Sequence, residues 1–318
     1  MRAPTGNQHH LVAVGPSGTS TATITEVAAG LRSYAVDGID LVETFPESVQ
    51  PPMASGIVLV PWPNRIRDGR WTHDGVTRQL ALTEPVKQNA SHGLLRFAPY
   101  REVTSTKNSI TLAATVFPQS GYPFQLDTTV TYTLTPDGLD VTHWVQNVGA
   151  DAAPYAVGAH PYFQIGGVPT RDLSLTTSAA TRILVDERSN PIGTESVAGT
   201  PFDLRAGRLV GDLDLDAGFE DVTVIDGRVE HTLAAPDGRS LTVWGDDSMR
   251  FVQLYTPRNF PTIANTAASV HQAVAIEPMT APADAFNSGK GVHWLQPGAD
   301  WTVRWGITHH GFTGGESQ

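Results

Sequence analysis

Apolar and polar residues alternate with a period of two through much of this chain, which is the pattern of half-buried β-strands. The clearest run, LDTTVTYTL over 126–134, alternates apolar residues with Asp and Thr. Pro-Asp-Gly at 136–138 favours a turn, and the alternation resumes over 139–145. We therefore predict a long β-hairpin over 126–145.

The same alternation recurs in other segments: SITLAATVF at 109–117, HTLAAPDGRSLTVWG at 231–245 and WTVRWGIT at 301–308. The frequent Thr and Val in these segments favour a pleated, half-buried surface. Helical periodicity is scarce, and we expect only short helical turns near 211–221 and 282–289.

Turn signals recur along the whole chain without a Gly/Ser-rich linker, a change of composition or a repeat of fixed period. The 318 residues are 40% hydrophobic, which is enough to build a substantial core. We predict one all-β domain over 1–318, a large antiparallel β-sandwich, with a flexible tail at about 311–318.

Composition narrows the classes of function. The formal net charge is −11 and no basic run occurs, which argues against nucleic acid because its phosphate backbone is bound by clustered Lys and Arg. The chain contains no Cys, so disulfides, zinc–thiolate sites and thiol catalysis are excluded. Neither a signal peptide nor an apolar run of membrane-spanning length is evident. We expect a soluble, cytoplasmic protein with no membrane partner.

Four stretches carry polar and strand-breaking residues that a β scaffold does not need: VPWPNRIRDGRW at 60–71, NASHGLLRF at 89–97, GAHPYF at 158–163 and VAIEPMTAPADAFNSG at 274–289.

Glu277 follows the apolar residues 274–276 and precedes Pro278, which we expect to end regular strand pairing. A carboxylate desolvated at such a place has a raised pKa, which suits a general base. A glutamate at a strand end can equally serve only to cap a turn.

The histidines allow several roles. His92, His160 and Glu277 together could hold zinc, although no closely spaced pair pre-forms such a site. His143 lies beside Trp144 within the predicted hairpin, and a structural role explains it better. From the residues alone, His160 is open to a structural, a metal-binding or a proton-transfer role.

Taken together and in this order, six pieces of the chain resemble the aldose 1-epimerase (galactose mutarotase) family in its bacterial branch: NRIRDG (64–69), SHG (91–93), HPYF (160–163), LDAGF (215–219), VQLYTP (252–257) and AIEPMTAPADAFN (275–287). Each piece alone is weakly specific, but their joint order spans most of the chain. The resemblance implies a mutarotase-like β-sandwich with an open sugar cleft. It also implies interconversion of the α and β anomers of a free hexose of the glucose or galactose type.

By the same resemblance the catalytic base falls on Glu277, the catalytic acid on His160 and a second catalytic histidine on His92. The expected substrate-binding residues are Arg65, Asp216, Gln253, Asn64 and Trp62. The implied partner is a small monosaccharide, with no metal or other cofactor, and the protein is expected to be a monomer or homodimer.

The chemistry of such a reaction fits one carboxylate and one imidazole. The base removes the proton of the C1 hydroxyl while the acid protonates the ring oxygen, and rotation about C1–C2 precedes reclosure. A histidine suits the acid role because its ordinary pKa, about 6.5, leaves a protonated fraction near neutrality. We therefore expect His160 to donate its proton to the ring oxygen.

The sequence departs from galactose-specific members at residues 61–63, where Pro-Trp-Pro replaces a glycine-containing lead-in, so the sugar is left open. One rival is an epimerase of an anionic sugar, a hexose 6-phosphate or a sulfonated sugar, whose anion would be gripped by Arg67, Arg70 or Arg96. Other rivals are a non-catalytic sugar-binding protein and a glycoside hydrolase or lyase using Asp216 and Glu277 as paired carboxylates.

Overall fold

The structure is a computed structural model, and it describes residues 2–15, 18–262 and 269–312. The predicted all-β antiparallel class is confirmed, since β-strands form three large antiparallel sheets. The one α-helix among the described residues is α1 (Ala285–Ser288). Three 3₁₀ turns accompany it: η1 (Pro52–Ala54), η2 (Thr170–Asp172) and η3 (Val210–Asp212).

The largest sheet has nine strands, in the order β10 (Arg101–Ser105), β11 (Ser109–Val116), β12 (Leu126–Thr135), β13 (Gly138–Asn147), β29 (Asp300–His310), β23 (Ser240–Asp246), β22 (Arg228–Ala234), β17 (Ser174–Thr177) and β20 (Arg208–Leu209). The predicted hairpin is confirmed as β12 paired with β13. The other three alternating segments lie in β11, in the β22–β23 hairpin and in β29.

The second sheet has eight strands. Seven follow the order β19 (Pro191–Ser196), β18 (Thr181–Val185), β21 (Asp216–Glu220), β24 (Phe251–Tyr255), β27 (Val274–Met279), β15 (Gly158–Ala159) and β5 (Val58–Leu59). The short β16 (Tyr162–Phe163) also pairs with β27.

A third sheet comprises β1 (Gln8–Gly15), β2 (Gly18–Thr25), β3 (Leu31–Val36) and β4 (Ile39–Asp40). Short two-stranded pairs complete the fold: β6 (Arg65–Arg67) with β9 (Asn89–Ser91), β7 (Arg70–His73) with β8 (Val76–Gln79), β14 (Ala153–Tyr155) with β28 (His293–Leu295), and β25 (Phe260–Pro261) with β26 (Val270–His271).

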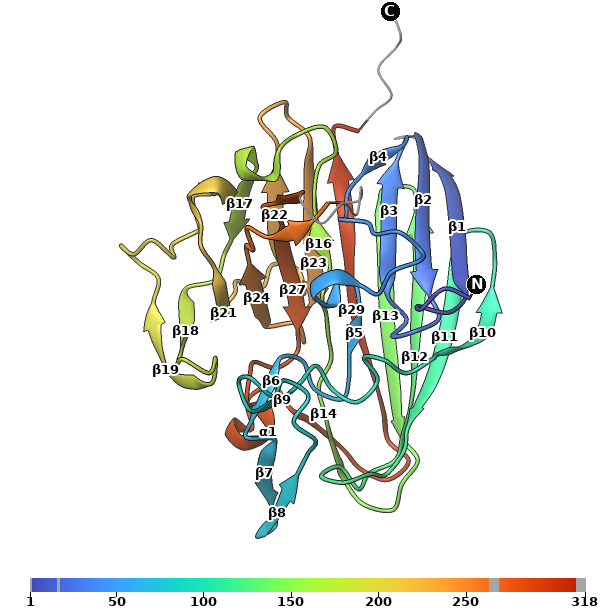
Figure 1. The fold of residues 1–318 in the computed structure, drawn as a ribbon, viewed down its shortest axis with the longest axis vertical. Coiled ribbons are helices and arrows are strands. Elements are labelled where there is room, and N and C mark those ends of the chain that lie inside the picture. Colours follow the sequence, from blue (N-terminus) through green and yellow to red (C-terminus); the bar gives the residue numbers. More distant parts are fainter. Residues whose placement is uncertain (1, 16–17, 263–268, 313–318) are drawn as a thin grey trace, which may run out of the picture.

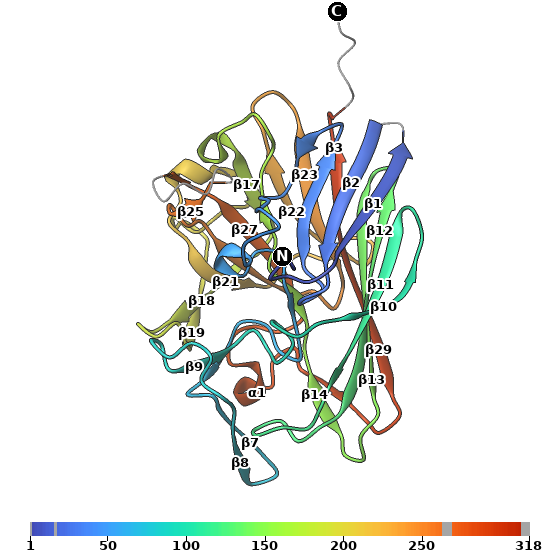
Figure 2. The same cartoon turned by 45° about the vertical axis from the view of Figure 1, so that its right-hand side comes forward.

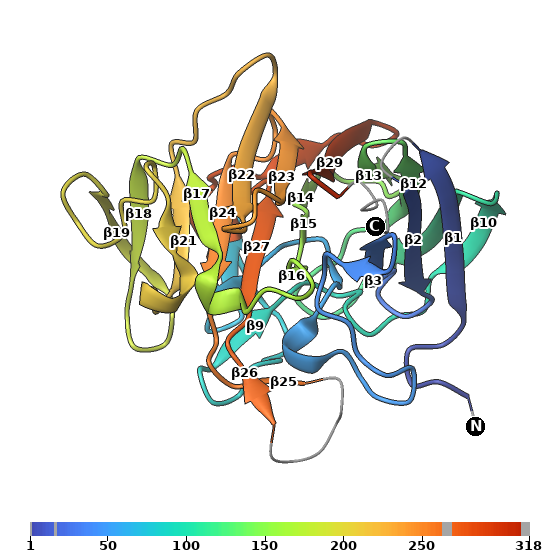
Figure 3. The same cartoon turned by 90° about the horizontal axis from the view of Figure 1, so that it is seen from above.

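The sheets are stacked in two layers (Figures 1 and 3). The nine-stranded sheet forms the backing layer. The β1–β4 sheet packs on its β11–β12 end, and the eight-stranded sheet packs on its other end, where β27 contacts β23. One cluster of buried apolar side chains runs between the layers from Leu11 to Phe312, and Tyr132 donates a buried hydrogen bond of 2.7 Å to the Ala29 carbonyl across it. Strands β7, β8 and β9 and helix α1 lie together below the eight-stranded sheet, and α1 and β9 are level with the lower ends of β13 and β29 (Figure 2).

The structure also bears on the expected helical turns, the role of His143 and the expected C-terminal tail. The helical turn expected near 282–289 is α1, whereas of the segment 211–221 only 211–212 belong to η3 and 216–220 form strand β21. His143 is structural, because it is 1% exposed and its Nε2 lies 3.0 Å from Trp305 Nε1, which donates to it. Of the expected tail, 313–318 lies outside the described residues, whereas Phe312 is buried against Arg239 and His309. No helix among the described residues has the length and apolarity to span a membrane.

The prediction that Pro278 ends strand pairing is wrong. β27 continues through it to Met279, and Pro278 lies opposite Val252 of β24. On its other side, β27 pairs with β16 only at Val274 and Ala275 and with β15 only at Met279. One edge of β27 is therefore paired along its whole length with β24, and the pairing along its other edge is interrupted. A proline is tolerated beside this interruption because fewer backbone N–H donors are needed there.

Candidate active site

The interruption beside β27 places His160 opposite Glu277. Gly158 of β15 pairs with Met279, and Tyr162 of β16 pairs with Ala275, in one continuous antiparallel register. His160 and Pro161 occupy the break between these two short strands, because proline has no N–H to continue the ladder. Extending the register across the break aligns His160 with Glu277.

The two side chains face each other inside the protein. His160 Nε2 lies 3.5 Å from Glu277 Oε1, and the residues are 6% and 2% exposed. Both line a cavity of about 380 Å³. The other predicted site residues that line this cavity are His92, Arg65, Asp216, Gln253 and Asn64.

A chain of polar side chains crosses the floor of this cavity. Gln253 of β24 is paired in register with Glu277. Its Nε2 donates to Asp216 Oδ1 at 2.7 Å, and its Oε1 accepts from Asn64 Nδ2 at 3.2 Å. The amide of Gln253 is thereby fixed, and the exposed Asp216 carboxylate keeps acceptor capacity for hydroxyl groups of a ligand.

Arg65 is held by a carboxylate that the sequence did not identify. Its Nε and Nη2 donate to Glu84 at 2.7 and 3.1 Å in a bidentate pair. Its Nη1 donates to Asn64 Oδ1 at 3.3 Å. This geometry fixes the plane of the guanidinium, which is the property that makes arginine a directional donor.

His92 is positioned by an unusual backbone path. His92 and Asn64 both have left-handed φ, at 62° and 53°, and the His92 N–H donates to the Asn64 carbonyl at 2.7 Å. Gly93 follows with a φ of 74°, and a Cβ at Gly93 would overlap the Val60 carbonyl oxygen. Such strained positions persist only where the surroundings fix them, and they concentrate at functional sites. The SHG motif thus turns the His92 ring toward His160, 5.4 Å away between ring centroids.

Burial changes the protonation expected of the central pair. It raises the pKa of Glu277 well above its ordinary value, with Asp216 acting in the same direction and Arg65 against it. Burial also lowers the pKa of His160 to about 4 and that of His92 well below its ordinary value. The expected protonated fraction of His160 near neutrality is therefore not supported, because desolvation favours the neutral form of each group. Both shifts favour the form of the pair in which Glu277 keeps its proton and His160 is neutral.

We predict that Glu277→Gln stabilises the fold increasingly as pH rises. The folded protein holds the Glu277 proton to a higher pH than the unfolded chain, so the stability this group contributes below pH 4.5 is lost as pH rises through its raised pKa. Glutamine cannot ionise and avoids that loss, about 1.4 kcal/mol for each pH unit by which the pKa is raised. Thermal unfolding at about pH 5 and about pH 8 measures the difference in Tm between variant and wild type. A difference that shrinks with pH would contradict the raised pKa.

Three predicted residues lie elsewhere. Trp62 is 1% exposed and packs on Tyr122 and Phe286 in the core, so it offers no face to a ligand. Arg67 reaches the Pro191 carbonyl and the carboxylates of Asp186 and Asp284. The exposed Arg70 donates to Gln79. Neither arginine lines the cavity, unlike Arg96.

Residues that sequence reasoning missed also line the cavity: Met53, Glu84, Lys87, Tyr162 and Tyr255. Tyr255 lies in the VQLYTP piece, and this motif could have identified it as a candidate site residue. Glu84 and Lys87 lie in a loop that contains no motif. Within the described residues, no three His, Asp or Glu side chains are grouped so as to hold a metal ion. The zinc alternative for His92, His160 and Glu277 therefore gains no support.

Comparison with known proteins identifies the family of the chain. The family model described as aldose 1-epimerase matches residues 10–308. The uncharacterised protein YihR of Escherichia coli K12 is 32% identical over 89% of this chain and 88% of its own length. The maltose epimerase of Levilactobacillus brevis is 28% identical over 69% of this chain and 68% of its own. An aldose epimerase homologue from C. elegans shares the fold, with a TM-score of 0.84 at 20% identity, covering 96% of this chain and 99% of that one. This chain belongs to the aldose 1-epimerase family.

Proposed function

We propose that this protein is a mutarotase that interconverts the α and β anomers of a free hexose by acid–base ring opening. The observation that carries the proposal is the facing pair His160 and Glu277, 3.5 Å apart and open to one cavity. An imidazole and a carboxylate at this spacing can reach two neighbouring oxygens of one hemiacetal, the C1 hydroxyl and the ring oxygen.

In the ring-opening step, Glu277 removes the proton of the C1 hydroxyl and His160 gives its proton to the ring oxygen. The C1–O5 bond breaks and the C1=O1 bond forms. Rotation about C1–C2 presents the other carbonyl face. Reclosure reverses both proton transfers, so the pair returns to its starting state without a nucleophile or redox step.

Because His160 and Glu277 share one proton, the cycle can proceed although both side chains are largely shielded from water. Burial favours the carboxylic acid with a neutral imidazole, so the shared proton first moves from Glu277 to His160. The resulting carboxylate and imidazolium open the ring, and opening returns the pair to a carboxylic acid with a neutral imidazole. Both states carry zero net charge, so neither requires an isolated buried charge, whose desolvation is costly. Burial of Glu277 and His160 then favours the one-proton state that the reaction uses.

The surrounding residues supply binding and stabilisation. Asp216 and Gln253 can accept from and donate to sugar hydroxyls, which orients the ring. Arg65 and the neutral His92 can donate toward negative charge that develops on a sugar oxygen. The name of the L. brevis relative, a maltose epimerase, supports epimerisation at a reducing sugar as the reaction class.

A second candidate is an epimerase of an anionic sugar, a phosphorylated or sulfonated hexose. The observation in its favour is that Lys87 and Arg96 both line the cavity. Lys87 Nζ donates to Ser189 and Arg96 donates to Ser91, and within the described residues neither lies within 4.0 Å of a carboxylate oxygen. Two cations without such a partner could bind an anionic substituent.

A comparison of sugars with paired variants separates the two candidates. Polarimetric decay of freshly dissolved α-glucose, α-galactose and glucose 6-phosphate gives kcat/KM for each. For a free-hexose mutarotase, Lys87→Gln and Arg96→Gln leave glucose turnover within about twofold, because the lost groups are not needed by a neutral sugar. For the anionic alternative, the phosphate is the better substrate and either variant lowers its kcat/KM by about tenfold or more, the loss of a charged hydrogen bond.

A further inference from the structure

Glu84 is the carboxylate that holds Arg65 at the active-site cavity, and both residues line that cavity. The two Glu84 oxygens accept from Arg65 Nε and Nη2 at 2.7 and 3.1 Å. Among the described residues, no other carboxylate oxygen lies within 4.0 Å of a nitrogen of this guanidinium. The Arg65 side chain is 14% exposed, so a largely buried cation depends on one carboxylate for direct pairing.

The backbone on both sides of this carboxylate is fixed by β9. The Glu84 N–H donates to the Asn89 carbonyl at 3.0 Å, and the Asn89 N–H donates to the Glu84 carbonyl at 3.3 Å. The neighbouring Thr83 Oγ1 accepts from the Ser91 N–H at 2.8 Å. Strand β9 pairs in turn with β6, where Ser91 lies opposite Arg65. Because the loop is bound to the strand beside that of Arg65, Glu84 lies within reach of the guanidinium.

Two further carboxylates, Asp216 and Glu277, line the same cavity as Arg65. Burial acts to lower the pKa of Arg65, but its hydrogen bonds to Glu84 raise it. The charges of Asp216 and Glu277 also act to raise it, and the net result is a raised pKa of Arg65. Both carboxylates are therefore close enough to attract the guanidinium, although only Glu84 forms an ion pair with it.

An ion pair between Arg65 and Glu277 would impair the acid–base pair. Burial raises the pKa of Glu277 and Asp216 acts in the same direction, whereas Arg65 acts to lower it. In direct contact, the guanidinium would stabilise the Glu277 carboxylate and occupy its oxygens, so Glu277 would take up the C1 hydroxyl proton less readily. The Arg65 donors would also be turned away from the sugar oxygen on which negative charge develops.

We propose that Glu84 is a positioning residue, which fixes the Arg65 guanidinium beside the sugar and prevents it from forming an ion pair with Glu277. This inference rests on the proposed mutarotase function. Both Glu84 oxygens accept from Arg65, so Glu84 acts on the reaction through Arg65 and transfers no proton itself. The effect of Glu84 on turnover should therefore disappear when Arg65 is replaced.

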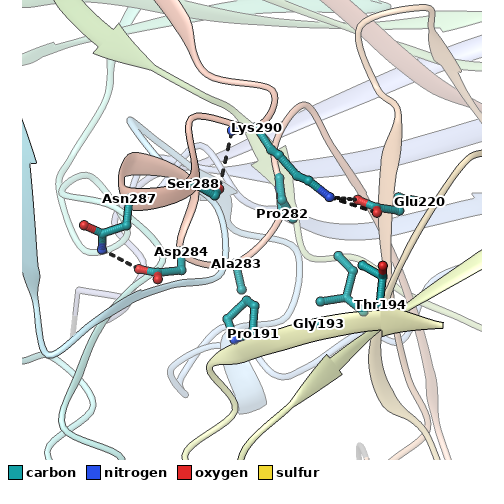
Figure 4. A pocket seen from close by; sticks show the side chains of 11 residues that line it. Pro191, Gly193, Thr194, Glu220, Pro282, Ala283, Asp284, Asn287, Ser288 and Lys290 are labelled. Carbon is teal, nitrogen blue, oxygen red and sulfur yellow. Dashed lines mark hydrogen bonds and ion pairs between the residues drawn. The ribbon is translucent and has the colours of Figure 1, made fainter.

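Glu220 and Lys290 offer a matched control pair (Figure 4). The two Glu220 oxygens accept from Lys290 Nζ at 2.9 and 3.0 Å, beside a separate cavity of about 350 Å³. The Glu220 side chain is 12% exposed and that of Glu84 is 26% exposed. Neither Glu220 nor Lys290 lines the active-site cavity. Glu220→Gln thus removes a comparable carboxylate from a cation without affecting Arg65.

Polarimetry with α-glucose on Glu84→Gln, Arg65→Gln and the double variant tests the proposal. Glutamine nearly preserves the shape of Glu84 but lacks its charge and its second acceptor oxygen. We expect Glu84→Gln to lower kcat by about tenfold or more, the loss of a charged hydrogen bond. KM should stay within about twofold, because the lost interaction acts on charge that develops during the reaction. In the Arg65→Gln background, Glu84→Gln should change kcat by less than about twofold.

The control Glu220→Gln should keep wild-type kcat and KM. Losses that multiply in the Glu84→Gln and Arg65→Gln double variant would overturn the proposal, because they would show that the two residues act independently. A loss confined to KM would overturn it as well, and so would an equal loss of kcat in Glu220→Gln. Thermal unfolding of each variant verifies that it is folded.

A crystal structure of Glu84→Gln tests the positioning role without any turnover. We expect an Arg65 nitrogen within about 4 Å of an oxygen of Glu277 or Asp216, the distance of an ion pair. A guanidinium that keeps its wild-type position would overturn the positioning role, whatever the activity. A displaced guanidinium, in a protein whose wild type interconverts no anomers, would support the positioning role and overturn the proposed mutarotase function alone.

Discussion

Glu277→Gln and His160→Asn should each lower kcat for anomer interconversion by about 10²–10⁴-fold, the usual contribution of one acid–base group. Both changes nearly preserve side-chain shape, but glutamine cannot take up the C1 hydroxyl proton and asparagine cannot transfer a proton to the ring oxygen. Because the two groups exchange one proton as a unit, the double variant should lose little more than either single variant. Polarimetry with α-glucose measures all three.

The control for this pair is His310→Asn, a change at an exposed histidine that does not line the cavity. It should keep wild-type kcat. Thermal unfolding of each variant distinguishes loss of chemistry from loss of fold. Turnover within about threefold of wild type in either Glu277→Gln or His160→Asn would remove that residue from the acid–base role.

Gly93→Ala should destabilise the fold by about 2–5 kcal/mol and reduce activity with it. A left-handed backbone costs a non-glycine residue about 1–2 kcal/mol. The added Cβ would also overlap the Val60 carbonyl oxygen, and such overpacking costs about 1–3 kcal/mol because backbone atoms cannot move aside cheaply. Relief of the overlap would displace the neighbouring His92 ring. Denaturant unfolding gives the stability change, and kcat gives the effect on the site.

Gly75→Ala is the matched comparison. Gly75 has the same φ as Gly93, 74°, in the turn between β7 and β8, but a Cβ there has no neighbour within 4 Å. Gly75→Ala should lower the free energy of unfolding by only about 1 kcal/mol, the cost of a left-handed backbone at a residue with a side chain, and it should leave kcat unchanged. If both alanine variants were equally stable, the close approach of Gly93 to Val60 would not be what requires glycine.

Local pattern was sufficient for the strands of the predicted hairpin. The hairpin over 126–145 follows from alternation and one Pro-Asp-Gly turn, both of which are short-range features. The effect of Pro278 on strand pairing was wrongly predicted because it depends on which strands lie beside β27. The break between β15 and β16, next to Pro278, arises from the tertiary structure and leaves no local signal in the sequence. Trp62 was misplaced for a related reason: the sequence around it resembles a site, but its ring fills the core beside Phe286.

The site was predicted by resemblance more than by local chemistry. Isolated motifs around His160 and Glu277 left structural and metal-binding roles open, and only the register across the β15–β16 break aligns the two side chains. Glu84 and Lys87 were missed because loop packing, which has no periodic signal, brings them to the cavity. The lowered pKa of His160 was missed too, since burial is a property of the folded site. The single-domain organisation and the residue roles stay predictions.

The most direct test of the acid–base pair is a crystal structure of Glu277→Gln with a bound reducing hexose. We expect the C1 hydroxyl oxygen within about 2.6–3.2 Å of the residue 277 amide and the ring oxygen within the same distance of His160 Nε2. A hexose seated in the same cavity with its anomeric carbon turned away from both side chains would contradict it.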